Sequence, residues 1–394
     1  MSKILLIMPL STLNWGEKNL GGVDSVCQML VRQLAQQERP YHYRVLAFDP
    51  LNNHSYSGEI IQLSKHLEVV ICPLREKRFG LPLPSLLSNW FRIQEQLKDY
   101  QPDLVHSHLN SWMIGLGQKT RNVLTLHSYR KIGRKPVSKL NDFVYEQIIP
   151  WVSNFSVDFY TCVGEELRQA LSLETNKPIQ VIGNPVDPDY FSANSANSAN
   201  SANSANSANQ NLPQNEVNLV TCALITRRKR IDRAIVLLRE LKQRRQAATL
   251  RIIGPNMDSA YYVQLQQLIK EYELEQEVIF LGKLNQREIV QQYQQANIGI
   301  FTSQQETFGL APLEMMAAGL PLISTPVGIL GERQATFDQL GVVFMQEGQE
   351  AMIAERISQI KITDTQAIQT YLRDQFAVEN VIEHYQNLYR EVLS

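Results

Sequence analysis

The chain has 394 residues, of which 44% are hydrophobic and 20% are charged, and its formal net charge is −1. This length predicts two globular domains, and the balanced charge argues against a nucleic-acid-binding protein. No apolar run approaches the roughly 18 residues that a membrane-spanning helix needs, and the run at residues 4–8 is too short for a signal peptide. The cysteines predict reduced core residues in a cytoplasmic protein, with no disulfide framework and no metal site. They are widely spaced, at Cys27, Cys72, Cys162 and Cys222.

From the N-terminus, short apolar runs alternate with segments of helical periodicity. In the first helical segment, Val26, Leu30 and Leu34 recur on one face. This alternation is typical of βαβ units, whose strands form a parallel sheet. The predicted strands are residues 4–8, 43–48, 67–71, 103–108, 122–126, 159–163 and 178–182, and the predicted helices are 23–37 and 86–100.

A repeat interrupts this pattern and divides the chain. Residues 192–209 read Ser-Ala-Asn six times, a low-complexity composition that predicts a disordered linker. The alternation then restarts, so we expect an α/β fold of two Rossmann-like domains with a ligand-binding cleft between them. The predicted strands are residues 219–225, 249–253, 278–281, 298–301, 322–324 and 342–344, and the predicted helices are 233–245, 260–272, 286–295 and 378–392. The predicted domains are 1–190 and 216–375, with a linker at 191–215 and a C-terminal helix at 376–394.

The most informative stretch is residues 306–314, Glu-Thr-Phe-Gly-Leu-Ala-Pro-Leu-Glu. It follows the apolar strand 298–301 and leads into a helix, so Glu306 and Glu314 bracket a strand-to-helix turn. Ligands of open α/β sheets bind at the carboxyl ends of the strands, where a helix N-terminus attracts anions. We therefore expect this turn to bind a phosphorylated ligand, with Glu314 placed for neutral hydroxyls.

Two other segments suit a phosphate. Residues 227–230 are Arg-Arg-Lys-Arg, directly after the first strand of the second half, where they bind a pyrophosphate or form a solvated loop. Gly21 and Gly22 begin a helix, where they allow a close approach to a ligand or form a structural turn. The chain has neither a Gly-x-Gly-x-x-Gly fingerprint nor a Walker sequence, which argues against NAD enzymes and P-loop ATPases.

Histidines and a basic cluster follow strands of the first half. His106, His108 and His127 lie at or just past strand ends, and His127, which directly terminates an apolar strand, is the strongest candidate for the site. A structural role is the alternative for each of them. The basic cluster faces either anionic lipid headgroups, an anionic acceptor, or solvent. Its residues are Arg130, Lys131, Arg134, Lys135 and Lys139.

These motifs together resemble retaining glycosyltransferases of family 4, which have the GT-B fold. Residues 306–314 resemble that family's Glu-x7-Glu signature, and Gly21-Gly22 is similar to its N-terminal glycine loop. Residues 103–108 resemble its Asp-Ile-Val-His-x-His strand, and residues 181–187 resemble Val-Ile-Pro-Asn-Gly-Val-Asp with two departures. Lys229 matches the family's donor lysine, but the family's arginine falls on Leu224. Either Arg227 or Arg228 would have to supply the missing charge.

The resemblance implies a transfer of a hexosyl group from a nucleotide-diphosphate sugar (UDP- or GDP-linked) to a glycan, lipid-linked or small-molecule hydroxyl, with retention, in polysaccharide or glycolipid biosynthesis. Catalytic residues would be Glu306, His127 and Lys229. The C-terminal helix would pack back on the first domain. No cofactor and no obligatory metal are expected, because cations and helix ends stabilise the leaving diphosphate. The donor-binding residues would be Gly21, Gly22, Arg228, Lys229, Thr307, Phe308, Gly309, Leu310 and Glu314.

Two other functions are compatible with the same motifs. One is a GT-B sugar-nucleotide epimerase, which would convert the donor without an acceptor. The other is a catalytically silent homologue that binds a nucleotide sugar, which Leu224 at the arginine position would favour. Whichever function applies, we expect the protein to be cytoplasmic, and contact through the basic cluster would place it at the inner face of the membrane.

Overall fold

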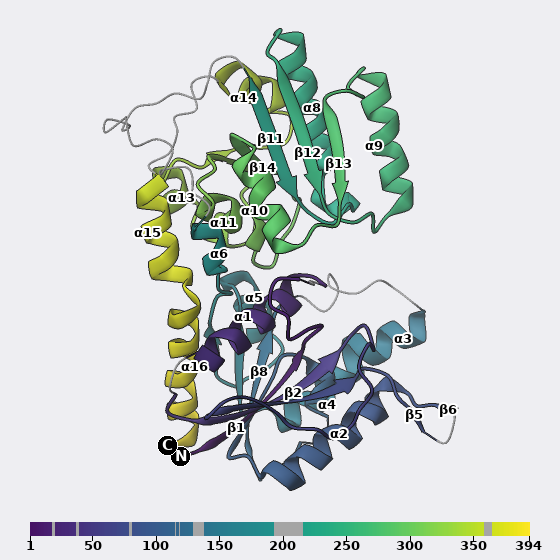
Figure 1. Cartoon of the computed structure of the whole chain (residues 1–394), viewed down its shortest axis with the longest axis vertical. Coiled ribbons are helices and arrows are strands. Elements are labelled where there is room, and N and C mark those ends of the chain that lie inside the picture. Colours follow the sequence, from purple (N-terminus) through teal and green to yellow (C-terminus); the bar gives the residue numbers. More distant parts are fainter. Residues whose placement is uncertain are drawn as a thin grey trace. The chain divides into compact units, whose positions relative to one another are not determined.

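The computed structural model describes residues 1–17, 20–36, 39–78, 81–114, 116–117, 119–128, 138–192, 216–357 and 365–394 (Figure 1). Apart from Ser192, the Ser-Ala-Asn repeat lies outside these residues, and so do Arg130, Lys131, Arg134 and Lys135. The chain divides into two compact units. Unit 1 comprises residues 1–185 and 378–394, and unit 2 comprises residues 186–377.

Unit 1 is built on one eight-stranded sheet of order β10-β9-β8-β7-β1-β2-β4-β3. All neighbours pair in parallel except β3, which pairs antiparallel with β4 at the edge. The central strands read as continuous apolar runs because helices cover both faces of a parallel sheet. The strands are β1 (Lys3–Pro9), β2 (His42–Asp49), β3 (Ile61–Ser64), β4 (Leu67–Pro73), β7 (Leu104–Ser107), β8 (Arg121–Leu126), β9 (Phe159–Cys162) and β10 (Ile179–Val181), with β5 (Lys77–Arg78) and β6 (Leu81–Pro82) as a separate pair.

The helices of unit 1 come from both ends of the chain. The long amphipathic helices predicted from periodicity are present, whereas the segment 139–156, for which no helix was predicted, is also helical. The helices are α1 (Gly22–Gln36), α2 (Ser85–Tyr100), η1 (Asn110–Trp112), α3 (Lys139–Phe143), the single π turn η2 (Val144–Ile148), α4 (Ile149–Ser156), α5 (Glu165–Ser172) and α16 (Val378–Leu393).

Unit 2 contains a second, wholly parallel sheet of order β13-β12-β11-β14-β15-β16. The prediction of an α/β fold with two parallel sheets is therefore confirmed. The strands are β11 (Val217–Cys222), β12 (Ala248–Ile253), β13 (Val278–Gly282), β14 (Ile298–Phe301), β15 (Leu322–Ser324) and β16 (Val343–Phe344). The helices are α6 (Pro188–Phe191), η3 (Arg227–Lys229), α8 (Ile231–Gln243), α9 (Ser259–Glu271), α10 (Gln286–Gln294), α11 (Leu310–Ala317), α12 (Ile329–Glu332), α13 (Gln334–Gln339), α14 (Glu350–Arg356) and α15 (Thr365–Phe376).

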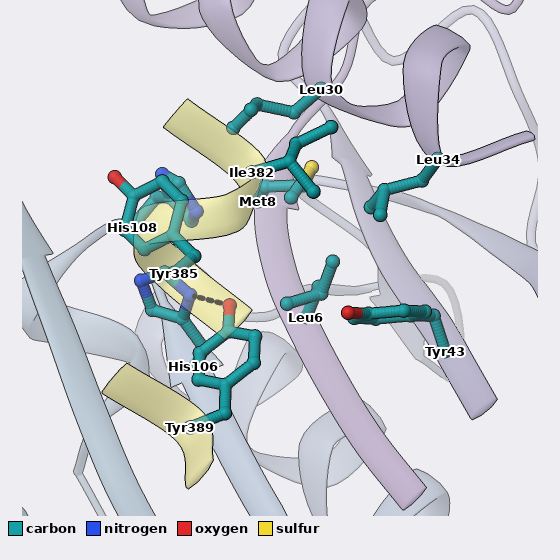
Figure 2. Close-up of a pocket in the computed structure, with 10 residues that line it drawn as sticks. All are labelled: Leu6, Met8, Leu30, Leu34, Tyr43, His106, His108, Ile382, Tyr385 and Tyr389. Carbon is teal, nitrogen blue, oxygen red and sulfur yellow. Dashed lines mark hydrogen bonds between the residues drawn. The ribbon is translucent and has the colours of Figure 1, made fainter. Parts of the chain in front are cut away.

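The C-terminal helix α16 packs against α1 and completes the core of unit 1 (Figure 1). Its buried face carries Tyr385 and Tyr389. The Tyr389 hydroxyl lies 2.5 Å from Nδ1 of His106, a residue that is 1% exposed (Figure 2). Beside this contact is a cavity of ≈ 20 Å³, the size of a single water. It is lined by Leu6, Met8, Leu30, Leu34, Tyr43, His106, His108, Ile382, Tyr385 and Tyr389.

Tyr389→Phe should destabilise unit 1, because it removes the hydroxyl while keeping the ring and leaves a buried nitrogen of His106 unpaired. Such a loss costs about 1–3 kcal/mol of unfolding free energy, measurable by urea denaturation. Glu383→Gln, at an exposed position of the same helix, is the control and should change the value by less than about 0.5 kcal/mol. Equal stability of the Phe variant and the wild type would contradict the importance of this contact.

Candidate active site

The turn between β14 and α11 forms the centre of the candidate site in unit 2. Gly309, with φ +87° and ψ +74°, precedes the first residue of α11. Pro312 lies in the first turn of that helix, where its missing N–H costs nothing. The amides of Leu310 and Ala311 have no intrahelical acceptor, since the first N–H groups of a helix never do. The sequence therefore folds locally into a strand, a turn and a helix N-terminus, as predicted.

Glu306 is 9% exposed and forms an ion pair with Lys229. Nζ of Lys229 lies 2.5 Å from Oε1 of Glu306, and Oγ of Ser303 lies 2.6 Å from the same oxygen. The side chains of Lys229 and Glu306 are only 13% and 10% exposed, so water solvates neither charge well. Each charge therefore depends on the other for its stabilisation.

The sheet order explains how residues distant in sequence meet here. β11 and β14 are neighbours and run in parallel, so the loops after them lie at the same edge of the sheet. The amide of Gln304 donates to the Arg228 carbonyl at 2.8 Å, and the hydroxyl of Thr302 donates to the Lys229 carbonyl at 3.1 Å. These bonds tie the cationic turn η3 to the loop that carries Glu306.

Gly328, which the sequence analysis did not single out, packs closely against the backbone of the turn at Phe308. A Cβ atom on Gly328 would lie 2.3 Å from the Phe308 carbonyl oxygen, far inside contact distance. The same carbonyl accepts a 2.8 Å hydrogen bond from the amide of Ile329. Phe308 is 4% exposed and its ring packs edge-on against Phe376 at 5.8 Å. The backbone of Phe308 is therefore fixed, and it directs the following residues into α11.

Glu314 lies one turn into α11, partly buried against α6. The pKa of Glu314 is raised to about 8, mainly by burial and in addition by the carboxylate of Asp187, while a hydrogen bond with Tyr190 acts in the opposite direction. Near neutral pH its carboxyl is therefore largely protonated in the unliganded unit. It can both donate to and accept from a hydroxyl group.

The cations of η3 differ in their surroundings. Arg227 is exposed and its guanidinium lies 5.8 Å from the centre of the Tyr261 ring. Arg228 is partly exposed, and within the described residues its side chain has no hydrogen-bond or ion-pair partner. Leu224, at the position of the family arginine, is 41% exposed. Of the two candidates for the missing charge, Arg228 is the one not already in contact with an aromatic ring.

In unit 1, the glycine pair lies at the start of α1. Gly21 has φ +131°, and apart from its chain neighbours none of the described residues has an atom within 4 Å of where its Cβ would be. Asp24, a residue missed in the sequence analysis, secures the preceding loop and is 4% exposed. Its carboxylate accepts hydrogen bonds from the amide of Ser11 at 2.8 Å and from the amide of Leu20 at 2.9 Å.

The three histidines form one stack in unit 1, in which His106 and His108 are buried and His127 is half-buried. The rings of His106 and His108 lie 4.7 Å apart, and those of His108 and His127 lie 5.1 Å apart. Nδ1 of His108 is 2.8 Å from Nε2 of His127, and Nε2 of His106 is 2.6 Å from the Thr125 hydroxyl. Burial lowers the pKa of His106 to about 3 and that of His127 to about 4, and it lowers that of His108 as well. All three rings are neutral at physiological pH.

Unit 1 should lose stability in mild acid. The unfolded chain binds protons on these histidines near pH 6.5, whereas the folded unit binds them only near pH 3–4. The contribution is therefore complete above pH 6.5 and declines as the pH falls toward 4. Thermal melts between pH 4.5 and 7.5 should show this slope.

His108→Asn should have a shallower slope, because one depressed histidine is removed. His384→Asn, at an exposed position of α16, should retain the wild-type slope. An unchanged slope in the His108 variant would contradict the assignment to the histidine stack.

The ion pair can be tested independently of any ligand. Lys229→Met should cost about 3 kcal/mol of unfolding free energy, because Glu306 would be left buried without its partner. The double variant Lys229→Met/Glu306→Gln should recover most of the lost unfolding free energy, which urea denaturation measures. The exposed pair Lys242–Glu277, at 44% and 26% exposure, gives the control, and Lys242→Met should cost less than about 1 kcal/mol. Full stability of the Lys229 single variant would contradict the pairing.

No group of three or more His, Cys, Asp or Glu side chains is arranged to hold a metal ion within the parts of the chain that the structure describes. Among the same residues, no helix has the length and hydropathy to cross a bilayer.

Comparisons with known proteins agree with the geometry. The model described as Glycosyltransferase Family 4 matches residues 20–190, and the model described as Glycosyl transferases group 1 matches residues 203–370. N-acetyl-alpha-D-glucosaminyl L-malate synthase of Bacillus anthracis is 24% identical over 314 residues, which are 74% of this chain and 73% of that protein.

Solved structures show the same fold over the whole chain. Sucrose-phosphate synthase from Thermosynechococcus elongatus superposes with a TM-score of 0.72 at 17% identity, covering 100% of this chain and 99% of that one. Anabaena HepE in complex with UDP superposes with a TM-score of 0.67 at 14% identity, covering 99% and 100%. The chain belongs to family 4 of the glycosyltransferases and has their GT-B fold.

Proposed function

We propose that the protein is a retaining glycosyltransferase that moves a hexosyl group from a UDP- or GDP-sugar to a hydroxyl of a glycan, lipid-linked or small-molecule acceptor, in polysaccharide or glycolipid biosynthesis. The observation that carries this proposal is the Lys229–Glu306 pair, located at the carboxyl edge of the unit 2 sheet in the turn that leads to the N-terminus of α11. A cation, free helix amides and a carboxylate are the groups needed around a departing diphosphate and a sugar.

The reaction breaks the bond between the anomeric carbon and the diphosphate oxygen, and forms a bond from that carbon to the acceptor oxygen, whose proton passes to the departing diphosphate. Negative charge develops on the diphosphate as it leaves. Lys229 and the amides of Gly309 and Leu310 stabilise that charge. Arg228 supplies the positive charge that relatives carry on an arginine at the position of Leu224. When the donor binds, Lys229 exchanges its contact with Glu306 for the phosphate, which releases Glu306 to bind the sugar before it is transferred.

Glu314 binds the ribose hydroxyls of the donor. Its raised pKa suits this role, because a neutral carboxyl loses less solvation than a carboxylate when a ligand covers it. Thr307 and Phe308 complete the donor-binding turn. In unit 1, we assign donor contacts to Gly21 and Gly22, and contact with the transferred sugar to His127, whose position is fixed by His108.

The choice of donor is supported by relatives. HepE has been solved in complex with UDP and, in a further structure, with UDP-glucose. The names of other relatives give different products, N-acetyl-glucosaminyl malate and sucrose phosphate. We therefore favour a UDP-sugar and keep the acceptor as a class of hydroxyl compounds. A cytoplasmic location, membrane contact through the basic cluster and independence from a metal stay predictions.

A thermal-shift screen should find the donor. UDP, GDP and ADP and their sugars are added in turn, and a nucleotide at 100 times its dissociation constant adds about 2.7 kcal/mol of stability. We expect UDP to raise the melting temperature of the wild type. The double variant Lys229→Met/Glu306→Gln should lose most of the shift, since it is expected to fold but lacks the Lys229 cation and keeps only Arg228 for the phosphate. Lys242→Met should keep it. If no nucleotide shifts the wild type, the proposal fails.

The exposed Leu224 favours one second candidate, a homologue that binds the nucleotide sugar without transferring it. Donor consumption with and without a hydroxyl acceptor separates the candidates. A transferase consumes the donor faster with the acceptor, a binding protein consumes none, and an epimerase converts it alone. Glu306→Gln should reduce transfer by roughly a factor of 100 or more if Glu306 contacts the reacting sugar.

A further inference from the structure

The carboxylate of Glu306 uses only one of its two oxygen atoms within unit 2. Lys229 and Ser303 both contact Oε1, at 2.5 Å and 2.6 Å. Among the residues that the structure describes, none forms a hydrogen bond with Oε2 of Glu306. The Glu306 side chain keeps 10% of its surface exposed, so Oε2 is the oxygen atom that is left for a ligand.

The hydroxyl of Ser303 can only act as a donor in its surroundings. Ser303 is 1% exposed, and three acceptors lie near its Oγ atom. They are Oε1 of Glu306 at 2.6 Å, the Gln305 carbonyl at 3.1 Å and the Arg228 carbonyl at 3.3 Å. A serine hydroxyl has one proton to donate. The carboxylate oxygen is both charged and nearest, so the proton points to Glu306.

The backbone of Ser303 is fixed by contacts with neighbouring segments. Its carbonyl accepts a 2.6 Å hydrogen bond from the hydroxyl of Thr325, which follows β15. The amide of Thr325 in turn donates to the carbonyl of Phe301, the last residue of β14, at 2.9 Å. None of these bonds involves the side chain of Lys229, so they persist when that side chain moves.

Lys229 and Ser303 therefore respond differently to a bound donor. The ammonium group of Lys229 sits on a flexible four-carbon stem, and in the proposed function it turns to the diphosphate. Ser303 is uncharged and short, and its backbone is fixed, so it stays beside Glu306. Once Lys229 has moved, Ser303 is the remaining partner of Oε1. Without it, the carboxylate of Glu306 would be free to rotate, and Oε2 would lose its direction.

We propose that Ser303 is a positioning residue of the transferase reaction, whose hydroxyl holds Oε1 of Glu306 while Oε2 binds a hydroxyl group of the donor sugar. An ionised carboxylate only accepts hydrogen bonds, so its natural partner on the sugar is a hydroxyl. The inference rests on the proposed function, and it adds the group that keeps Glu306 in place after the ion pair has opened.

The affinity for the sugar part of the donor tests this role without an acceptor. Calorimetry on the full chain gives the dissociation constants of UDP, UDP-glucose and UDP-N-acetylglucosamine. We expect the wild type to bind one of the two sugars more tightly than UDP. Ser303→Ala should lose most of this preference, while its dissociation constant for UDP should change by less than about threefold, because Ser303 does not contact the phosphate.

Slow hydrolysis of the preferred UDP-sugar gives a second readout. The bond from the anomeric carbon to the diphosphate breaks, a bond to a water oxygen forms, and a water proton passes to the diphosphate. Ser303→Ala should reduce this rate roughly tenfold or more, as expected for the loss of a hydrogen bond to a charged group. Ser303→Thr keeps the hydroxyl and should recover most of the rate.

Ser324→Ala is the matched control. Ser324 is fully buried at the end of β15, and its hydroxyl donates to the Thr325 carbonyl at 2.9 Å and not to a carboxylate. This variant should keep the sugar preference and the hydrolysis rate. In a Glu306→Ala background, Ser303→Ala should have no further effect on either quantity, because the group that it holds is absent. Thermal melts check that each variant is folded.

Three outcomes would overturn the inference. In the first, Ser303→Ala keeps the wild-type preference for the UDP-sugar. In the second, the wild type binds UDP and both sugars equally. In the third, Ser303→Ala loses UDP binding together with a large fall in melting temperature, which indicates a general structural role. These outcomes leave nucleotide binding by the wild type intact, whereas a wild type that binds no nucleotide overturns the proposed function and this inference with it.

Discussion

The candidate site of unit 2 depends on one interaction with a high desolvation cost, the buried ion pair between Lys229 and Glu306. Removing two charges from water costs several kcal/mol for each, and only good geometry with further hydrogen bonds recovers that cost. Here Ser303 supplies a hydrogen bond, and the backbones on both sides are tied together. A ligand that brings phosphate oxygens and sugar hydroxyls can satisfy both charges separately. Without a ligand, Lys229 and Glu306 therefore stabilise each other, and a bound substrate would replace this ion pair with its own contacts to each residue.

The polar core of unit 1 is built from neutral side chains and not from an ion pair. His106, His108 and His127 are all neutral, and each uses a ring nitrogen to contact a neighbour, with Tyr389 and Thr125 at the end of the series. A neutral imidazole costs less to bury than a charged one, and His106 has partners on both of its ring nitrogens. The stack therefore fixes the ring of His127 through a rigid set of contacts and not through an ion pair. Because burial disfavours the protonated rings, we expect acid to lower the stability of unit 1.

The sequence predicted well those features that depend on local pattern. Strands β14 and β15 were placed with the observed bounds, because their apolar runs are bounded by polar residues and glycine. The ion-pair partners Lys229 and Glu306 were placed at one site by family resemblance, but their direct contact spans 77 positions and no local pattern contains it. Gly328 was missed, since an isolated glycine gives no sign of the carbonyl that it packs against.

The helices α3, η2 and α4, which the sequence analysis did not predict, were missed for a different reason. Periodicity analysis assumes a uniform 3.6-residue repeat, and the π turn η2 breaks that repeat in the middle of the segment. The edge strand β3 was missed for a related reason, because a four-residue, partly exposed strand has too few positions to show a pattern. Both are cases in which tertiary context, rather than local sequence, decides the structure.

The position of α16 has a consequence for how the protein is made. His106 must wait for Tyr389, which is 283 positions later in the chain, so the ribosome completes all of unit 2 before unit 1 receives its last helix. Domains usually fold in the order of their synthesis, but here unit 1 cannot be completed until unit 2 has been synthesised. Until α16 has been synthesised, the apolar face of α1 against which it packs stays uncovered. A truncation that removes α16 would therefore damage the unit whose synthesis begins first, although it leaves all of unit 2 in place.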